Sequence, residues 1–284
     1  MNTNDLKIFE AVAANGSFTK AAEATFTVQS NVTARIKSLE DEFGIHLFTR
    51  TSRKVELTAA GETLMHYCKQ ISHLIEEAKK ELSKADQVTG QLKIGCIDTT
   101  MALQVPEILN RFADTYPDVE LEFRSANVSN LVNEVLNYKL DAAFVVAPVH
   151  QPELEQRYVK EDQLVVLSSA AHPDLEQLLA ANPVKIIVFE QGCIFRSRLE
   201  SWLSFKGIIN YKCTVLNSIE GIINFVEAGI GISILPAQLI KQYYENRKLV
   251  TFPIHKELGT LNTVIAFRKD VPQSRALKAF LEMY

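Results

Sequence analysis

The sequence predicts a mixed α/β protein in which a small helical head and one long helix precede a two-lobed α/β region. Three observations support this fold class. Helical periodicity followed by a basic segment occupies residues 1–58. An apolar heptad runs from Leu64 to Leu82 within the linker segment, residues 59–89, and strand-like and helix-like segments alternate over residues 90–284. We expect the alternating region to form a first lobe from residues 90–161 and 268–284 and a second lobe from residues 162–267.

The composition is that of an ordinary globular protein: 47% of the 284 residues are apolar and 23% are charged. No apolar stretch reaches membrane-spanning length and no secretory leader pattern opens the chain, so we expect a cytoplasmic protein without a membrane partner. The four cysteines are widely scattered, which argues against a metal site or a disulfide framework. No nucleophile-elbow, Walker or dinucleotide motif is present, so we expect no catalytic residues and no cofactor.

The head is expected to contain three helices and a basic hairpin. Thr19 is the expected N-cap of the second helix. The third helix, residues 28–43, has its apolar positions at helical spacing. These positions are Val32, Ile36, Leu39 and Phe43. Short strands at residues 45–48 and 55–57 flank a turn with three cations in five residues, Arg50 to Lys54, which completes the outline of a winged helix-turn-helix.

The third helix and the basic turn supply candidate contacts to double-stranded DNA, although the net charge of the chain is −4. A helix fits the major groove and Gln can pair with adenine there, so Gln29 on the first turn is the expected base reader. Arg35 and Lys37 would contact phosphates, and Arg53 and Lys54 would enter the minor groove. The full candidate set is Ser17, Thr19, Gln29, Ser30, Asn31, Thr33, Arg35, Lys37, Arg50, Arg53 and Lys54. The alternative is an ordinary solvated face.

A fourth helix, capped by Thr58 and reaching to about residue 85, carries apolar residues at alternating spacings of four and three. This heptad seam is the pattern that pairs helices side by side. The expected dimerisation contacts are Leu64, Ile71, Ile75 and Leu82. Packing of the helix on its own domain shares this periodicity in part and remains the alternative.

From residue 90 onward, the alternation of strands and helices predicts a mostly parallel sheet covered by helices, with one helix over residues 99–116 and a strand over residues 164–168. In such sheets ligands bind beyond the carboxyl ends of the strands, where helix N-termini favour anions. We therefore expect a small-molecule effector, which could be anionic, between the lobes. The candidate contacts are Thr99, Thr100, Asn127, Ser129, Pro148, Cys193, Phe195, Asn217 and Ser218. Each could instead be a simple N-cap.

Motifs along the whole chain resemble those of the LysR-type transcriptional regulators. The matching residues in the head include Phe9, residues 16–22 (Gly-Ser-Phe-Thr-Lys-Ala-Ala), Gln29, Leu39, Glu40 and residues 57–61 (Leu-Thr-Ala-Ala-Gly). Those in the second half include residues 226–232 (Val-Glu-Ala-Gly-Ile-Gly-Ile) followed by Leu235 and Pro236. The chain departs from the family pattern at Thr25 and Phe26, where the family usually carries Leu at the first position, and at Ala126 and Val128 after the second strand of the α/β region.

The resemblance implies a winged helix-turn-helix, a linker helix and a periplasmic-binding-protein-like effector domain. It also implies a homodimer or homotetramer on an inverted-repeat operator, with a small co-inducer and RNA polymerase as further candidate partners. One redox-sensing branch of the family carries a reactive cysteine at a helix start similar to that of Cys193. There a helix N-terminus and nearby Arg196 and Arg198 would lower the thiol pKa, so peroxide sensing is an alternative. A solute-binding receptor and an enzyme are alternatives from other classes.

Overall fold

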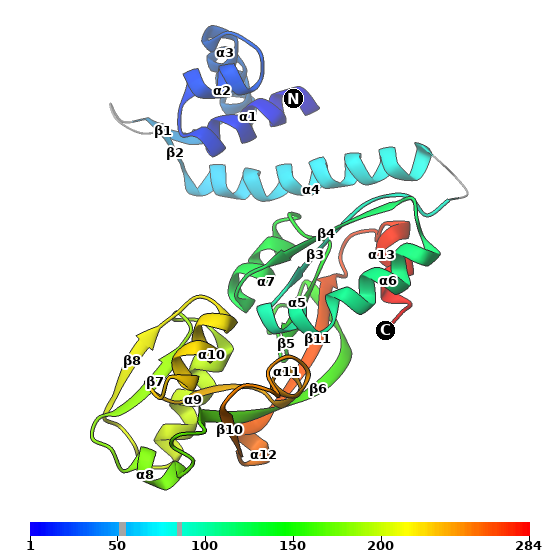
Figure 1. The fold of residues 1–284 in the computed structure, drawn as a ribbon. Helices are drawn as coiled ribbons and strands as arrows, with labels where there is room; N and C mark the ends of the chain where they lie inside the picture. The colour runs from blue at the N-terminus through cyan, green and yellow to red at the C-terminus, as the bar shows by residue number, and fades with distance from the viewer. Residues whose placement is uncertain (51–54, 84–86) are drawn as a thin grey trace. The chain divides into compact units, whose positions relative to one another are not determined.

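The computed structural model describes residues 1–50, 55–83 and 87–284, and it divides into two compact units, Met1–Leu82 and Ser83–Tyr284 (Figure 1). One apolar core lies in the first unit, and two clusters of buried apolar residues lie in the second. The mixed α/β class and the two lobes of the second unit agree with the prediction from sequence.

The first unit is a helical head with a two-stranded hairpin. Its elements are α1 (Thr3–Asn15), α2 (Phe18–Ala24), α3 (Gln29–Phe43), β1 (Phe48–Arg50), β2 (Val55–Leu57) and α4 (Ala59–Ser83). Three of the four residues of the predicted stripe of α3 turn inward: Val32, Ile36 and Leu39 are buried against Phe9 of α1 and Leu47. The prediction was wrong for Phe43, which is exposed at the last position of the helix. Burial of this stripe orients the opposite side of α3 toward solvent.

Two local predictions for the head were wrong. Ser17, not Thr19, is the N-cap of α2, because its hydroxyl accepts the Lys20 N–H and Thr19 already lies in the first turn. The first strand begins at Phe48 and not at residue 45. The Ile45 N–H donates to the Glu40 carbonyl, which makes residue 45 part of the end of α3.

Helix α4 begins as predicted, since the Thr58 hydroxyl accepts the Gly61 N–H at 3.0 Å. The first half of its apolar seam packs on the head itself: Cys68 is fully buried, and Leu64 and Ile71 lie against the same core. At the far end Leu82 is 84% exposed. Packing on its own domain therefore accounts for the first half of the seam and leaves the second half available.

The second unit contains the remaining helices and strands. Those of its first part are β3 (Gly90–Cys96), α5 (Asp98–Leu103), α6 (Val105–Thr115), β4 (Val119–Ser125), α7 (Val128–Leu136), β5 (Ala142–Val146) and β6 (Leu154–Ser169). Next come α8 (Leu175–Leu179), β7 (Val184–Val188), α9 (Ile194–Phe205), β8 (Tyr211–Val215), α10 (Ile219–Glu227) and β9 (Ser233–Pro236). The last are α11 (Ala237–Tyr243), β10 (Leu249–Pro253), α12 (Lys256–Gly259), β11 (Thr260–Arg268) and α13 (Arg275–Leu281).

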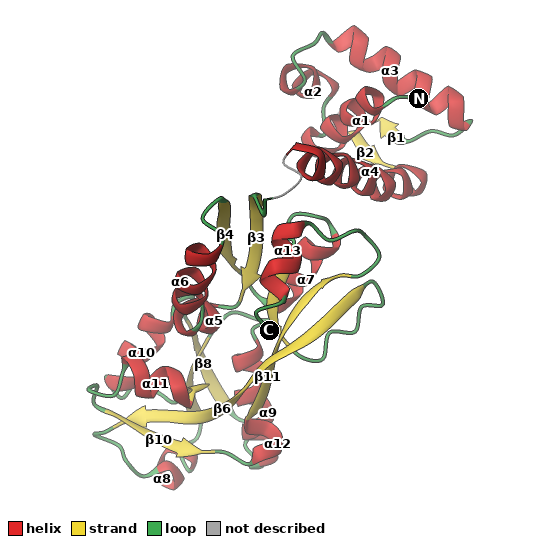
Figure 2. Ribbon diagram, turned by 90° about the vertical axis from the view of Figure 1, so that its right-hand side faces the viewer, coloured by secondary structure: helices red, strands yellow, loops and turns green. Residues whose placement is uncertain are grey.

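The main sheet has the order β10-β6-β11-β5-β3-β4, with β9 paired to β6. In this sheet β3 pairs in parallel with its two neighbours, β4 and β5, whereas β6 and β11 pair antiparallel with all their neighbours. The expected mostly parallel sheet is therefore wrong for the sheet as a whole. The long strands β6 and β11 run between the two lobes (Figure 2). The second lobe adds a separate parallel pair, β7 and β8 (Figure 1).

Other differences from the prediction have local causes. The helix expected over residues 99–116 is two helices, α5 and α6. The break falls at Gln104, two residues before Pro106, which cannot donate a backbone hydrogen bond to the preceding turn. Strand β6 is far longer than the predicted residues 164–168. Its first half carries mostly polar residues, so the apolar pattern indicated only the second half as a strand. The sequence analysis did not predict α8, α11, α12 or β10.

Candidate functional site

The outward side of α3 presents the expected polar face. Gln29, Ser30 and Lys37 are exposed, and Thr33 is partly exposed. Gln29 occupies the first position of the helix, and its side-chain oxygen lies 3.4 Å from the Thr19 hydroxyl, which donates to it from α2. This contact holds the side chain of Gln29 near the open end of α3, where a base-reading residue belongs.

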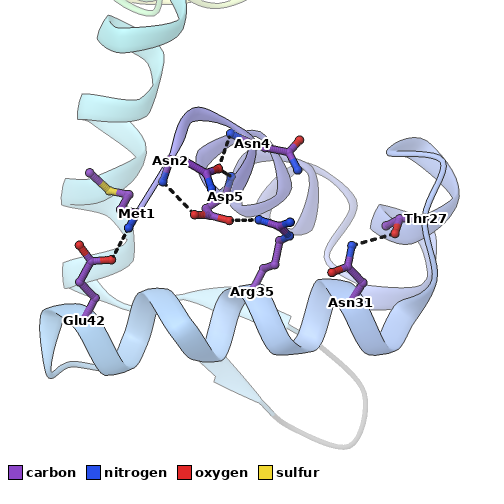
Figure 3. Close-up of polar contacts among 8 residues, drawn as sticks. All are labelled: Met1, Asn2, Asn4, Asp5, Thr27, Asn31, Arg35 and Glu42. Atoms are coloured by element: carbon purple, nitrogen blue, oxygen red, sulfur yellow. Dashed lines mark hydrogen bonds and ion pairs between the residues drawn. The ribbon is translucent and has the colours of Figure 1, made fainter.

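Arg35 lies on a different side of α3 and has a partner within the head (Figure 3). Its guanidinium donates to the Asp5 carboxylate of α1 at 2.5 Å, and the other oxygen of Asp5 accepts the Asn2 N–H at 2.8 Å. Burial raises the pKa of Asp5, but the hydrogen bonds from Arg35 and Asn2 outweigh it and hold the pKa below its usual value. Arg35 thus fastens α3 to the start of α1.

The other candidate DNA contacts occupy varied positions. Asn31 donates its amide to the Thr27 hydroxyl at 2.9 Å (Figure 3). Ser17 is engaged as the cap of α2. Arg50 ends β1. Arg53 and Lys54, at the expected tip of the wing, lie outside the described residues.

Two apolar residues next to the polar face were missed by the sequence analysis. In the turn between α2 and α3, Phe26 is 98% exposed with a backbone φ of 52°, and Val28, the residue preceding Gln29, is 65% exposed. A left-handed conformation is unusual for a residue other than glycine. The sequence did contain a signal for the exposure of Phe26. The family usually carries Leu where this chain has Thr25, so the apolar residue is shifted by one position to Phe26 and no longer points into the core.

The second unit contains a cavity of about 260 Å³ between its two lobes. Its walls come from the segments that follow β3, β4, β7 and β8, all at the carboxyl ends of parallel strands. This is where ligands are expected in such sheets. The lining residues are Ile97, Asp98, Ser125, Ala126, Asn127, Val128, Phe189, Glu190, Cys193, Ile194, Phe195 and Asn217.

The cavity brings together four of the nine predicted effector contacts: Asn127, Cys193, Phe195 and Asn217. The other five are not among its lining residues. Thr99 and Thr100 are buried within α5, and Ser218 caps α10 by accepting the Gly221 N–H at 3.1 Å. Ser129 and Pro148 are exposed.

Sequence reasoning missed three polar residues of the cavity, namely Asp98, Ser125 and Glu190. Asp98 begins α5, and its carboxylate accepts a hydrogen bond from the Ser125 hydroxyl at the end of β4. Their places after β3, β4 and β7 were the available signal, because every strand end of a parallel pair faces the same edge of its sheet.

Cys193 does not have the activated thiol that its helix-start position predicts. Burial raises its pKa, and the backbone N–H groups of Phe195 and Arg196 lower it only in part. The negative charges of Asp98 and Glu190 raise it further. The pKa of Cys213 is also raised, mainly by burial. This environment disfavours a thiolate and therefore peroxide sensing.

The cysteines give a testable prediction. Burial raises the pKa of Cys68 and of Cys96 to about 12, so both remain protonated at neutral pH. In the folded protein we expect a disulfide reagent to modify exposed Cys213 first and partly exposed Cys193 more slowly, while buried Cys68 and Cys96 react only on unfolding. Mass spectrometry of the labelled sites would check this. Fast sulfenic acid formation at Cys193 in dilute peroxide would contradict it.

Across the described part of the chain, no helix is long and apolar enough to cross a membrane. Within the same residues, no group of three or more His, Cys, Asp or Glu side chains could hold a metal ion.

Comparison with known proteins identifies the family. Residues 3–62 match a family described as the bacterial regulatory helix-turn-helix protein, lysR family, and residues 85–284 match the LysR substrate binding domain. The HTH-type transcriptional regulator YusT of Bacillus subtilis is 37% identical over all of this chain and 95% of its own length. GltR of the same species is 34% identical over 99% of this chain and 95% of its own length.

Solved structures share the fold across the full chain. ArgP from Mycobacterium tuberculosis superposes with a TM-score of 0.74 at 20% identity, covering 99% of this chain and 95% of ArgP. CbnR complexed with its target DNA gives 0.68 at 21% identity, covering 99% of this chain and 98% of CbnR. The chain belongs to the LysR family of transcriptional regulators, with a helix-turn-helix DNA-binding domain and an effector-binding domain. Its relatives are regulators and not enzymes.

Proposed function

We propose that this LysR-type regulator reads an inverted-repeat operator with the exposed face of α3 and acts on chromosomal DNA in the cytoplasm. The observation that carries the proposal is the position of Gln29 on the first turn of α3, exposed and held by Thr19. A recognition helix places its N-terminal residues against base edges. We also propose residues 1–58 as the DNA-binding domain, 59–89 as the linker helix and 90–284 as the effector-binding domain.

The proposed contacts differ in role. Gln29 and Ser30 would contact bases, and Lys37, two turns further along α3, would contact a phosphate. Phe26 and Val28 lie beside them and offer apolar surface for a thymine methyl group. For the wing, the basic residues Arg53 and Lys54 remain candidates on the strength of the sequence.

We propose that the second half of α4 joins two copies of the chain. Leu74 and Leu82 are large exposed apolar residues, and Ile75 of the same half is only partly covered. A heptad edge of this kind is buried by a partner helix. Leu64 and Ile71 serve the core of the head, so the proposed dimer contacts are Ile75 and Leu82.

The cavity between the lobes is the proposed effector site. Asn127, Cys193, Phe195 and Asn217 supply its contacts on both sides, so a ligand bound there touches both lobes. Such a ligand has different contacts when the lobes move apart, and this difference is what allows binding to shift the conformation of a regulator.

Selection of binding sites from a pool of random DNA duplexes by the full-length protein tests the proposal. We expect two inverted half-sites, about one helical turn or a multiple of it apart. Gln29→Ala should relax the preference at one base position of each half-site, at a cost of about 1–3 kcal/mol. Ser38→Ala, an exposed change later on α3, is the matched control. Recovery of single half-sites, or an equal loss on every sequence with Gln29→Ala, would contradict the proposal.

A further inference from the structure

We propose that the effector of this regulator carries a positively charged nitrogen, an ammonium or guanidinium group, bound between Asp98 of the first lobe and Glu190 of the second. This inference rests on the proposed effector site and adds the chemical class of its ligand. The sequence left an anionic effector open, with Thr99 and Thr100 among the candidate contacts, and the proposal gives the effector the opposite charge.

The two carboxylates reach the cavity from opposite lobes. Asp98 follows β3, and Glu190 follows β7. The charges of both are felt by the Cys193 thiol in the same cavity. Asp98 is held by the Ser125 hydroxyl, which donates one hydrogen bond and leaves the remaining lone pairs of the carboxylate for a second donor.

No cation of the protein balances these charges within the cavity. Its lining, all of it within the described residues, includes two carboxylates and no Lys, Arg or His. The two basic residues directly next to the lining in sequence are paired elsewhere: Arg124 with Glu134 at 3.0 Å and Arg196 with Glu200 at 2.9 Å. Arg198, further along α9, is not among the lining residues. An anionic ligand would therefore meet two like charges and no counter-charge.

One helix start at the cavity is already capped. At α7 the Asn127 side chain accepts the Asn130 N–H at 2.9 Å. A bound anion would have to displace that acceptor, whereas a cation would leave it in place.

The rest of the lining selects an organic cation and not a metal ion. Ile97, Phe189, Ile194 and Phe195 contribute apolar surface that would cover the carbon atoms of a small molecule. The described residues provide no group of three His, Cys, Asp or Glu side chains that could hold a metal. One ligand nitrogen that binds acids from opposite lobes would contact both lobes at once, so binding favours approach of the lobes.

Thermal unfolding of the full-length protein with matched probes tests the proposal. Cadaverine and agmatine are the cationic probes, glutarate is the anionic probe, and zinc chloride is the metal control. We expect at least one cationic probe to raise Tm with saturation in the millimolar range or below. Asp98→Asn and Glu190→Gln should each weaken that binding about tenfold or more, because a charged hydrogen bond is lost. Glu120→Gln removes a carboxylate of β4 outside the cavity and should bind as the parent does.

Each other outcome overturns the proposal. If glutarate raises Tm, and raises it more in Asp98→Asn, the cavity is an effector site but its ligand is an anion, which contradicts the proposed charge. Stabilisation by zinc alone, or by neither cationic probe at millimolar concentration, would also refute it. Site selection on DNA does not depend on these probes, so a failure here is distinguishable from a failure of the proposed DNA-binding function.

Discussion

Gly61→Ala is expected to destabilise the head by about 3 kcal/mol or more while leaving the second unit intact. Gly61 lies in the first turn of α4, directly against the chain that precedes β1. A Cβ atom there would lie 2.2 Å from the Leu47 carbonyl oxygen and 3.2 Å from its carbon. Because both are backbone atoms, the clash cannot be relieved by turning a side chain, and α4 or the segment before β1 must shift.

The single tryptophan makes this prediction selective. Trp202 is buried in α9 of the second unit, so its fluorescence reports unfolding of that unit alone. In Gly61→Ala we expect part of the far-UV circular dichroism signal to be lost at lower urea, with the Trp202 transition unchanged. Glu62→Ala, an exposed change in the same turn, is the control. An unchanged circular dichroism transition in Gly61→Ala would show that the close approach relaxes at little cost.

Glu40→Ala is expected to cost about 2–5 kcal/mol, because it removes a buried acceptor from two backbone donors. The Glu40 carboxylate accepts the Leu47 N–H at 2.8 Å and the Phe48 N–H at 3.3 Å. Both donors lie where α3 gives way to β1, and the carboxylate is buried with them. Without it, the two N–H groups lose their partner in a site that water reaches poorly.

The conservative change separates hydrogen bonding from charge. Glu40→Gln keeps one acceptor oxygen, so we expect it to lose less stability than Glu40→Ala in the same urea titration. Equal stability of Glu40→Ala and the parent would show that water or a backbone shift satisfies Leu47 and Phe48.

Features determined by local spacing were predictable from the sequence. The buried part of the α3 stripe and the Thr58 cap follow from periodicity and capping chemistry that lie within one segment. Residues that follow parallel strands gave the place of the cavity and four of its lining residues. The exposed face of α3 is what remains once the stripe is buried.

Features determined by distant partners were not predictable. Arg35 resembles a phosphate contact in sequence, but its partner is Asp5, thirty residues earlier. The heptad of α4 does not show which of its residues are covered. Cys68 is buried and Leu82 is exposed, because the core of the head covers the first half of the helix and not the second. The acidity of the cavity arises because Asp98 and Glu190 line it from two different lobes, which no local pattern encodes.

The dependence of DNA binding on salt is the most direct test of the claim that the outward face of α3 binds DNA. For the full-length protein on its selected operator, log affinity should fall linearly with log salt. Lys37→Ala should reduce that slope by about one, because one phosphate contact is lost. Arg35→Ala should lower the stability of the head and leave the slope of the folded protein unchanged, since its guanidinium pairs with Asp5. A slope that is unchanged in Lys37→Ala and reduced in Arg35→Ala would contradict this assignment of the DNA-binding face.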